Sequence, residues 1–174
     1  RFHLVVKAKE RQKALAATLN SIQIQSYANW QVSLCQVTTS AVVLDETIKL
    51  DTRINLTAHL NVADDDYLIF LEEGDQLASD CLSILAEQLQ QQPKAIIYSD
   101  HDLLNDTLLR VAPRFKPQWN PDLLMHQNYI GQAFAVQAKR LQAVWQEPHW
   151  WLQHHYVLLL QAVMAISPAE RANQ

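Results

Sequence analysis

Three acidic side chains and a glycine directly follow an apolar run in the middle of the chain. The run covers residues 67–71, and it is followed by Glu72, Glu73, Gly74 and Asp75. A short apolar run bounded by turn residues is typical of a buried strand in an α/β sheet, and open α/β sheets bind ligands where their strands end. Carboxylates fixed there can hold a divalent cation, which in turn holds a diphosphate. The same residues also suit a solvated turn, with a positive φ at Gly74 and Asp75 capping the next segment.

A second group of reactive side chains follows another apolar segment. Asp100, His101 and Asp102 come directly after residues 94–99, which have the composition of a strand. Two carboxylates and an imidazole at a strand end can bind or activate a sugar hydroxyl. The alternative is a loop in which the aspartates form Asx turns, and the sequence pattern alone leaves both interpretations open.

The elements that must position these groups alternate along the chain. Strands are predicted at residues 2–6, 30–37, 53–57, 67–71, 94–99 and 131–137. Helices are predicted at residues 10–25, from a cap at Ser79 or Asp80 to the neighbourhood of Pro93, from Asn120, and from Ala138. Alternating strands and helices predict a layered α/β domain with a largely parallel sheet. Prolines 113, 117 and 121 exclude a regular helix over residues 111–119.

Composition narrows the class of protein. The 174 residues are 49% hydrophobic and 18% charged, which favours one folded domain with a substantial core. A net charge of −4 argues against a nucleic-acid partner, and two glycines are too few for a Gly-rich phosphate loop. Cys35 and Cys81 are interpreted as buried free thiols in a reducing compartment. The chain, residues 1–174, is expected to be a fragment of, or a module in, a longer protein.

Four segments in order resemble one enzyme family. Residues 19–30, LNSIQIQSYANW, are similar to the pattern L-x-S-I-x-x-Q-x-Y-x-N-W, and residues 67–75 stand where that family has Y-I-x-F-L-D-x-D-D. Residues 97–102 resemble I-Y-S-D-E-D, and residues 115–131 resemble F-K-P-D-W-S-P-D-L-L-x-x-Q-N-Y-I-G. The family is that of the family-2 glycosyltransferases of the GT-A fold, in the branch of O-antigen and rhamnan biosynthesis. The resemblance covers nearly the whole chain and weakens after Arg140.

The resemblance implies a three-layer α/β/α nucleotide-sugar transferase fold with a mainly parallel mixed sheet. It also implies transfer of a sugar from a nucleotide-sugar donor to a polysaccharide or lipid-linked acceptor, with Mg²⁺ or Mn²⁺ as cofactor. By position in the motifs, Glu72 and Asp75 would hold the metal. The nucleotide would contact Thr38, Thr39 and Glu73. The sugar and acceptor would contact Asp100, Asp102, Trp119 and Asn128.

The chain departs from the family on its reactive face. Where the family has an acidic D-D-x-S turn, residues 37–40 read VTTS, and Gly74 replaces the second acid of the metal motif. Val157 stands at the position expected for the general base, and valine cannot accept a proton. No catalytic residue is therefore assigned, although His154 or His155 is close enough in sequence to substitute.

Two functions follow from the same fold. One is an active glycosyltransferase with relaxed metal use. The alternative is a catalytically inactive module that binds glycan or protein. The family and the absence of an export signal predict a cytoplasmic location, with peripheral association at the inner membrane face and flanking domains left open.

Overall fold

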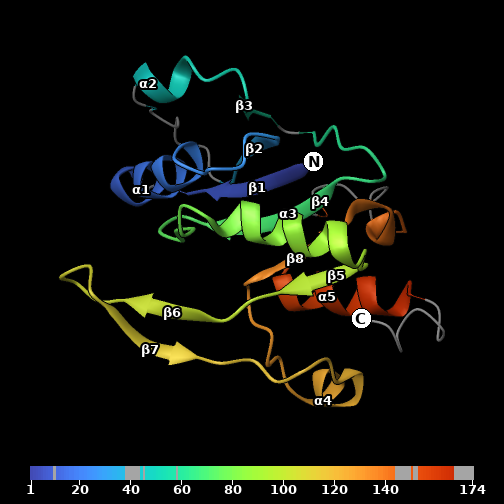
Figure 1. Ribbon diagram of the computed structural model, residues 1–174. Coiled ribbons are helices and arrows are strands. Elements are labelled where there is room, and N and C mark those ends of the chain that lie inside the picture. The colour runs from blue at the N-terminus through green and yellow to red at the C-terminus, as the bar shows by residue number, and fades with distance from the viewer. Residues whose placement is uncertain are drawn as a thin grey trace.

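A six-stranded sheet forms the centre of the computed structural model, which describes residues 1–9, 11–37, 44, 46–57, 59–143, 150 and 153–166. The strands are ordered β3-β2-β1-β4-β8-β5 (Figure 1). Their bounds are Phe2–Ala8 for β1, Trp30–Gln36 for β2, Ile54–Leu56 for β3, Tyr67–Glu72 for β4, Ile96–Tyr98 for β5 and Phe134–Gln137 for β8. β1 to β4 run parallel, and β8 is antiparallel to both β4 and β5. The predicted mainly parallel mixed sheet is confirmed.

The central strand β1 is buried along its whole length because it has a strand on each edge and a helical layer on each face. Leu4 pairs with Val32 of β2 on one side and with Ile69 of β4 on the other. All seven residues of β1 are buried, including the polar His3 and Lys7. The continuous burial explains the apolar character of the strand and makes its two polar residues exceptional.

Two helical layers cover the sheet and complete the α/β/α arrangement (Figure 1). Helices α1 (Gln12–Gln23) and α3 (Cys81–Gln91) pack on the face that carries Leu4, Val6, Ile69 and Leu71. Helix α5 (His155–Met164) packs on the opposite face, where Val5, Leu68 and Phe70 point. Alternate residues of β1 and β4 thus enter different cores, as a strand's period of two requires.

The helix starts show which capping predictions were right. Asn120 caps α4 (Pro121–His126), and its side chain accepts a hydrogen bond from the Leu123 amide, as predicted. Asp80 does precede α3, but its side chain makes no capping hydrogen bond. The buried Gln25 supplies one instead, because its Oε1 accepts from the Leu82 amide at 3.0 Å. Residues 138–141 form only a short 3₁₀ helix, η1 (Ala138–Leu141).

A two-stranded sheet that the sequence analysis did not predict stands apart from the central one. Strands β6 (His101–Leu104) and β7 (Arg110–Arg114) form an antiparallel hairpin that extends from the body in Figure 1. The Oδ1 of Asn105 accepts hydrogen bonds from the amides of Thr107 and Leu109 and so organises the turn. The alternative interpretation of residues 100–102 as an irregular loop was therefore wrong for His101 and Asp102.

Smaller features complete the chain. A short helix, α2 (Glu46–Lys49), lies between β2 and β3. Cys35 and Cys81 are free, as predicted, but only Cys35 is fully buried. Within the described residues, no helix combines the length and the apolar composition needed to cross a bilayer.

Candidate functional site

Glu72, at the carboxyl end of β4, has two lysines as partners. Its Oε2 lies 2.8 Å from the Nζ of Lys9, and its Oε1 lies 3.6 Å from the Nζ of Lys7. Burial raises the pKa of Glu72, but the Lys9 and Lys7 ammonium groups outweigh it and leave the pKa below its ordinary value. The first acid of the expected metal motif is therefore an ionised, internally paired carboxylate.

Lys7 is held in place under this turn. Its side chain is 6% exposed, and its Nζ donates a hydrogen bond to the carbonyl of Gln153 at 3.1 Å. Burial lowers the pKa of Lys7, while the nearby Glu72 carboxylate opposes that shift. Two charged groups, one from β1 and one from β4, thus share a poorly solvated place at the end of the sheet.

His155, the first residue of α5, closes the same cluster from the other side. Its side chain is 2% exposed, and its Nε2 lies 3.8 Å from the Oε1 of Glu72. Neither ring nitrogen has a hydrogen-bond partner among the residues that the structure describes. Burial, and then the charge of Lys7, lowers the pKa of His155 to about 4. The imidazole is therefore neutral at physiological pH.

Glu73, which the resemblance assigned to the nucleotide, faces inward. The residue is 7% exposed, and its two oxygens accept hydrogen bonds from the backbone amides of Lys9 at 2.5 Å and Arg11 at 3.0 Å. These two amides belong to the connection between β1 and α1. The carboxylate of Glu73 therefore ties that connection to the turn after β4.

Asp75 and Gly74 complete the turn. The Oδ2 of Asp75 accepts from the Glu72 amide at 2.8 Å, and the Gly74 amide donates to the Oγ1 of Thr18 at 2.9 Å. Gly74 has φ +104°, a region that side chains with a Cβ rarely adopt. Burial, and after it the charge of Glu72, raises the pKa of Asp75. The predicted positive φ of Gly74 is confirmed, whereas Asp75 binds back to the Glu72 amide at the end of β4 and does not cap the next segment as expected.

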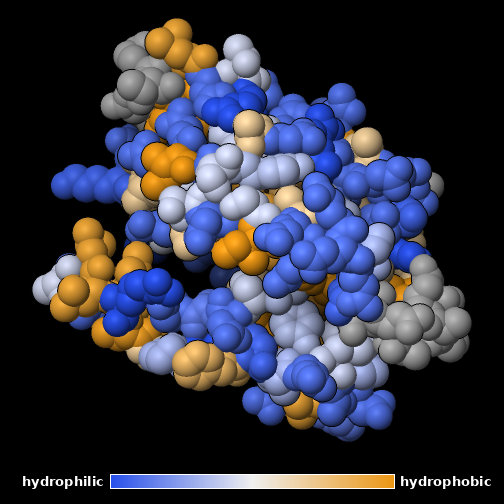
Figure 2. Space-filling view, in the orientation of Figure 1, coloured by the Kyte–Doolittle hydropathy of each residue, from blue (hydrophilic) through white to orange (hydrophobic). Residues whose placement is uncertain are grey.

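A large cleft lies between that turn and the hairpin. Its volume is about 1070 Å³, and Figure 2 shows the hollow to the left of the body, above the hairpin. One wall comes from residues 74–78, another from β6 and β7, and a third from residues 127–133. Asp75 lines the cleft, whereas Glu72 does not belong to its lining. The two predicted metal ligands therefore face different surroundings.

The predicted sugar-binding residues also divide into those that line the cleft and those that do not. Asp102 and Asn128 line the cleft, but Asp100 and Trp119 do not. Asp102 pairs with Arg110 across the hairpin, and the Oδ1 of Asn128 accepts from the Gly131 amide at 2.9 Å. Asp100 accepts from the Lys116 amide at 2.7 Å. The three polar candidates thus each make a hydrogen bond or an ion pair within the fold.

The fourth candidate, Trp119, belongs to an aromatic cluster behind the cleft. Its ring packs against Tyr98, with centroids 6.4 Å apart, and Tyr98 also contacts Tyr129 edge-on. The Tyr98 hydroxyl donates to the carbonyl of Pro117, and the Tyr129 hydroxyl accepts from the Asn120 amide. Trp119 and Tyr129 of the motif block are therefore held by packing, and Tyr129 also lines the cleft, as does the exposed Phe115 of the same block.

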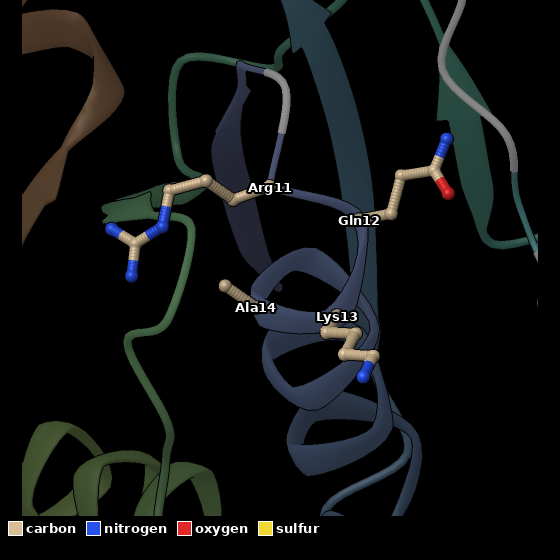
Figure 3. Close-up of a pocket in the computed structure, with 4 residues that line it drawn as sticks. All are labelled: Arg11, Gln12, Lys13 and Ala14. Atoms are coloured by element: carbon tan, nitrogen blue, oxygen red, sulfur yellow. The ribbon is translucent and has the colours of Figure 1, made fainter. Parts of the chain in front are cut away.

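A smaller hollow of about 380 Å³ lies at the start of α1. It is lined by Arg11, Gln12, Lys13 and Ala14, and Figure 3 shows the side chains of Arg11 and Gln12 pointing to opposite sides of the helix start. Thr38 and Thr39, predicted to contact the nucleotide, lie outside the described residues. Their assignment stays a prediction.

The expected base position does not face the large cleft. Val157 lies on α5, is 43% exposed, and is absent from the cleft lining. His154 is the N-cap of α5, and its Nδ1 accepts from the Tyr156 amide at 3.2 Å. Neither His154 nor the buried His155 is placed to act on a ligand in the cleft.

Several residues of the site were missed from the sequence. Lys7, Lys9 and Arg110 make the main ion pairs, yet none of them stood in a quoted motif. A signal did exist for Lys7, since a lone lysine inside an otherwise apolar strand is rarely buried without a partner. Among the described residues, no group of three or more His, Cys, Asp or Glu side chains is arranged as a metal site.

The α/β domain, with its cleft beside the carboxyl end of β4, has a glycosyltransferase-like fold. Its arrangement matches that of S. aureus TarS. The likeness to TarS residues 1–349 in complex with UDP has a TM-score of 0.70 and 12% identity, and it covers 95% of this chain and 55% of that one. A TarS structure in complex with UDP-GlcNAc matches with a TM-score of 0.60 over 82% of this chain and 47% of that one. The resemblance drawn from the motifs is thus confirmed at the level of the fold.

Sequence comparison points in the same direction. The chain is 29% identical over 148 residues to the O-antigen biosynthesis protein RfbC of Myxococcus xanthus, which covers 75% of this chain. It is 30% identical over 134 residues, 67% of its length, to an uncharacterized protein of Sinorhizobium fredii. The chain spans 12% and 15% of the length of these two relatives. No family model matches the chain.

Proposed function

We propose that this glycosyltransferase-like domain binds a saccharide in the large cleft and does not transfer sugar itself. The observation that carries the proposal is that all three acids at the carboxyl end of β4 bind other groups of the fold. Glu72 pairs with lysines, Glu73 binds two backbone amides, and Asp75 binds the Glu72 amide. The groups that a transferase needs at this strand end are thus committed to the fold, while a cleft large enough for a saccharide remains.

The lining of the cleft supports a saccharide as ligand. Hydroxyl-rich ligands are recognised by a few fixed polar groups beside apolar or aromatic surface. Here the paired Asp102 and Arg110, the exposed Gln132 and the ring of Tyr129 lie around one hollow. Asp102 is the hydrogen-bond acceptor in this set, because its carboxylate can accept hydrogen bonds from sugar hydroxyl groups while it stays paired with Arg110.

A second candidate is transfer of a sugar from a nucleotide-sugar donor to a polysaccharide or lipid-linked acceptor. It is favoured by the printed names of the similar proteins, one for O-antigen biosynthesis and one solved with UDP-GlcNAc. Under this proposal the domain would serve cell-envelope polysaccharide synthesis in the cytoplasm, at the inner face of the membrane. Thr38 and Thr39 would then meet the nucleotide.

We expect Asp102→Ala to weaken saccharide binding about tenfold or more, because a hydrogen bond to a charged group contributes about 1.5–3 kcal/mol. The measurement is saturation-transfer NMR and calorimetry with N-acetylglucosamine and rhamnose oligosaccharides. Asp65→Ala is the matched control, since Asp65 is an exposed acid in the turn before β4, at the opposite end of that strand. Equal affinity in both variants, or no binding to any oligosaccharide, contradicts the proposal.

An assay with nucleotide-sugar donors distinguishes saccharide binding from sugar transfer. UDP-GlcNAc, a dTDP-sugar and a GDP-sugar are each incubated with the chain and the oligosaccharides, and release of the nucleoside diphosphate is followed. We expect no release above the uncatalysed rate. Sugar transfer to an oligosaccharide would establish the second candidate and remove the first.

A further inference from the structure

The place that a divalent cation would take beside Glu72 is already occupied by positive charge. Two ammonium groups, Lys9 at 2.8 Å and Lys7 at 3.6 Å, face this one carboxylate. Mg²⁺ and Mn²⁺ are bound by carboxylate oxygens, with waters and ligand oxygens completing the shell. A dication approaching Glu72 would therefore have to displace Lys9 and would still be repelled by the buried Lys7.

The backbone conformation at Gly74 also disfavours an acidic residue at the second position of the metal motif. The motif position of the second acid is Gly74, whose φ of +104° strains any residue with a side chain. Within the described residues, an ideal Cβ there would meet only the Cβ of Ala14 at 3.9 Å, so the obstacle is the backbone conformation and not space. The backbone of the turn has a conformation that favours glycine at position 74. The chain therefore departs from the metal motif in backbone conformation as well as in residue type.

Asp75 cannot make up the pair. The carboxylate of Asp75 accepts a hydrogen bond from the Glu72 amide, and Asp75 lines the cleft. The Glu72 side chain instead lies beside Lys7 of β1 and His155 of α5. Glu73 is fully used by the amides of Lys9 and Arg11. The residues present therefore do not fit the divalent cation that the resemblance implied.

We propose that Lys9, supported by Lys7, is a tethered cation that takes the place of the divalent metal at the end of β4. The ammonium group of Lys9, whose side chain is 52% exposed, is the positive charge that a ligand can reach. The buried ammonium group of Lys7 lies on the protein side of Glu72 and helps to hold its carboxylate in place. Any ligand at this strand end then meets an ammonium group and no metal. This inference does not depend on saccharide binding in the cleft.

The test is a titration of the whole chain with MnCl₂ at neutral pH, following the electron paramagnetic resonance signal of free Mn²⁺. We expect no saturable binding below about 1 mM in the wild-type chain. Lys9→Glu puts a carboxylate where the ammonium stood, and it is expected to bind Mn²⁺ at least tenfold more tightly. Adding Glu72→Gln to that variant should remove the gain.

The matched control is Lys13→Glu, which makes the same change of charge on an exposed lysine in the first turn of α1, four residues later in the chain. Wild-type binding as tight as that of Lys9→Glu overturns the proposal, and so does equal binding by Lys9→Glu and Lys13→Glu. A second measurement applies if Lys9→Glu does not fold. The ¹⁵N resonance of the Lys9 ammonium group should differ between the labelled wild-type chain and the labelled Glu72→Gln variant. Equal chemical shifts in the two chains would overturn the pairing of Lys9 with Glu72.

Discussion

Replacing Glu73 with alanine is expected to lower the free energy of unfolding by about 2–4 kcal/mol. The carboxylate is buried and accepts from the amides of Lys9 and Arg11. Its removal takes away the charged acceptor of two part-buried hydrogen bonds from backbone amides, and a hydrogen bond to a charged group contributes about 1.5–3 kcal/mol. Urea unfolding followed by circular dichroism measures the change.

Glu87→Ala is the control, because Glu87 is an exposed glutamate on α3. A surface substitution of that kind is expected to stay within about 0.5 kcal/mol. Glu73→Gln should fall between the two, since its amide can accept from only one of the donors. If Glu73→Ala were as stable as Glu87→Ala, the structural role of Glu73 would be wrong and its expected contact with a nucleotide would regain support.

The fold was predictable from the sequence because its determinants are local and periodic. The apolar run of β4, the stripe of Leu82 and Leu85 on α3, and the Asn120 cap each follow from neighbouring residues. Their order then restricts the topology to a few arrangements. The hairpin of β6 and β7 escaped prediction because β7 is fully exposed and contains Pro113, so neither an apolar run nor an alternation marks it.

The site was less predictable because its contacts join residues distant in sequence. Motif positions correctly located the turn at residues 72–75 but could not show that Glu72 meets Lys9, 63 positions earlier in the chain, or that Glu73 binds the backbone. Whether a carboxylate binds a ligand or stabilises the fold depends on which other groups of the folded chain lie within hydrogen-bond or ion-pair distance of it. That choice is made by tertiary packing, in which β1 and β4 lie side by side with their ends in register.

Acidification is expected to destabilise the fold between pH 6.5 and 4 through His3, a buried residue of β1. Its side chain lies beside the Oγ of Ser33 at 2.8 Å, and burial, followed by the charge of Arg1, lowers its pKa to about 4. The unfolded chain therefore binds a proton that the folded chain refuses, so stability is intact above pH 6.5 and falls below it. The loss from His3 reaches about 3 kcal/mol at pH 4.

The double variant His3→Leu with Ser33→Ala removes the titrating ring together with its partner, so no buried polar group is left unpaired. Urea unfolding across pH 7 to 4 should then show a smaller loss that does not vanish, because His155, whose pKa is also lowered to about 4, and Glu72, whose pKa is lowered, still titrate. The carboxylate of Asp51, whose pKa is lowered from about 3.8 to about 2 chiefly by its hydrogen bond with Arg53, loses most of its contribution below pH 4. His126→Leu, at an exposed position on α4, is the control and should keep the wild-type slope. An unchanged slope in the double variant would show that His3 takes up its proton in the folded state, and would assign the acid sensitivity of the fold to other groups.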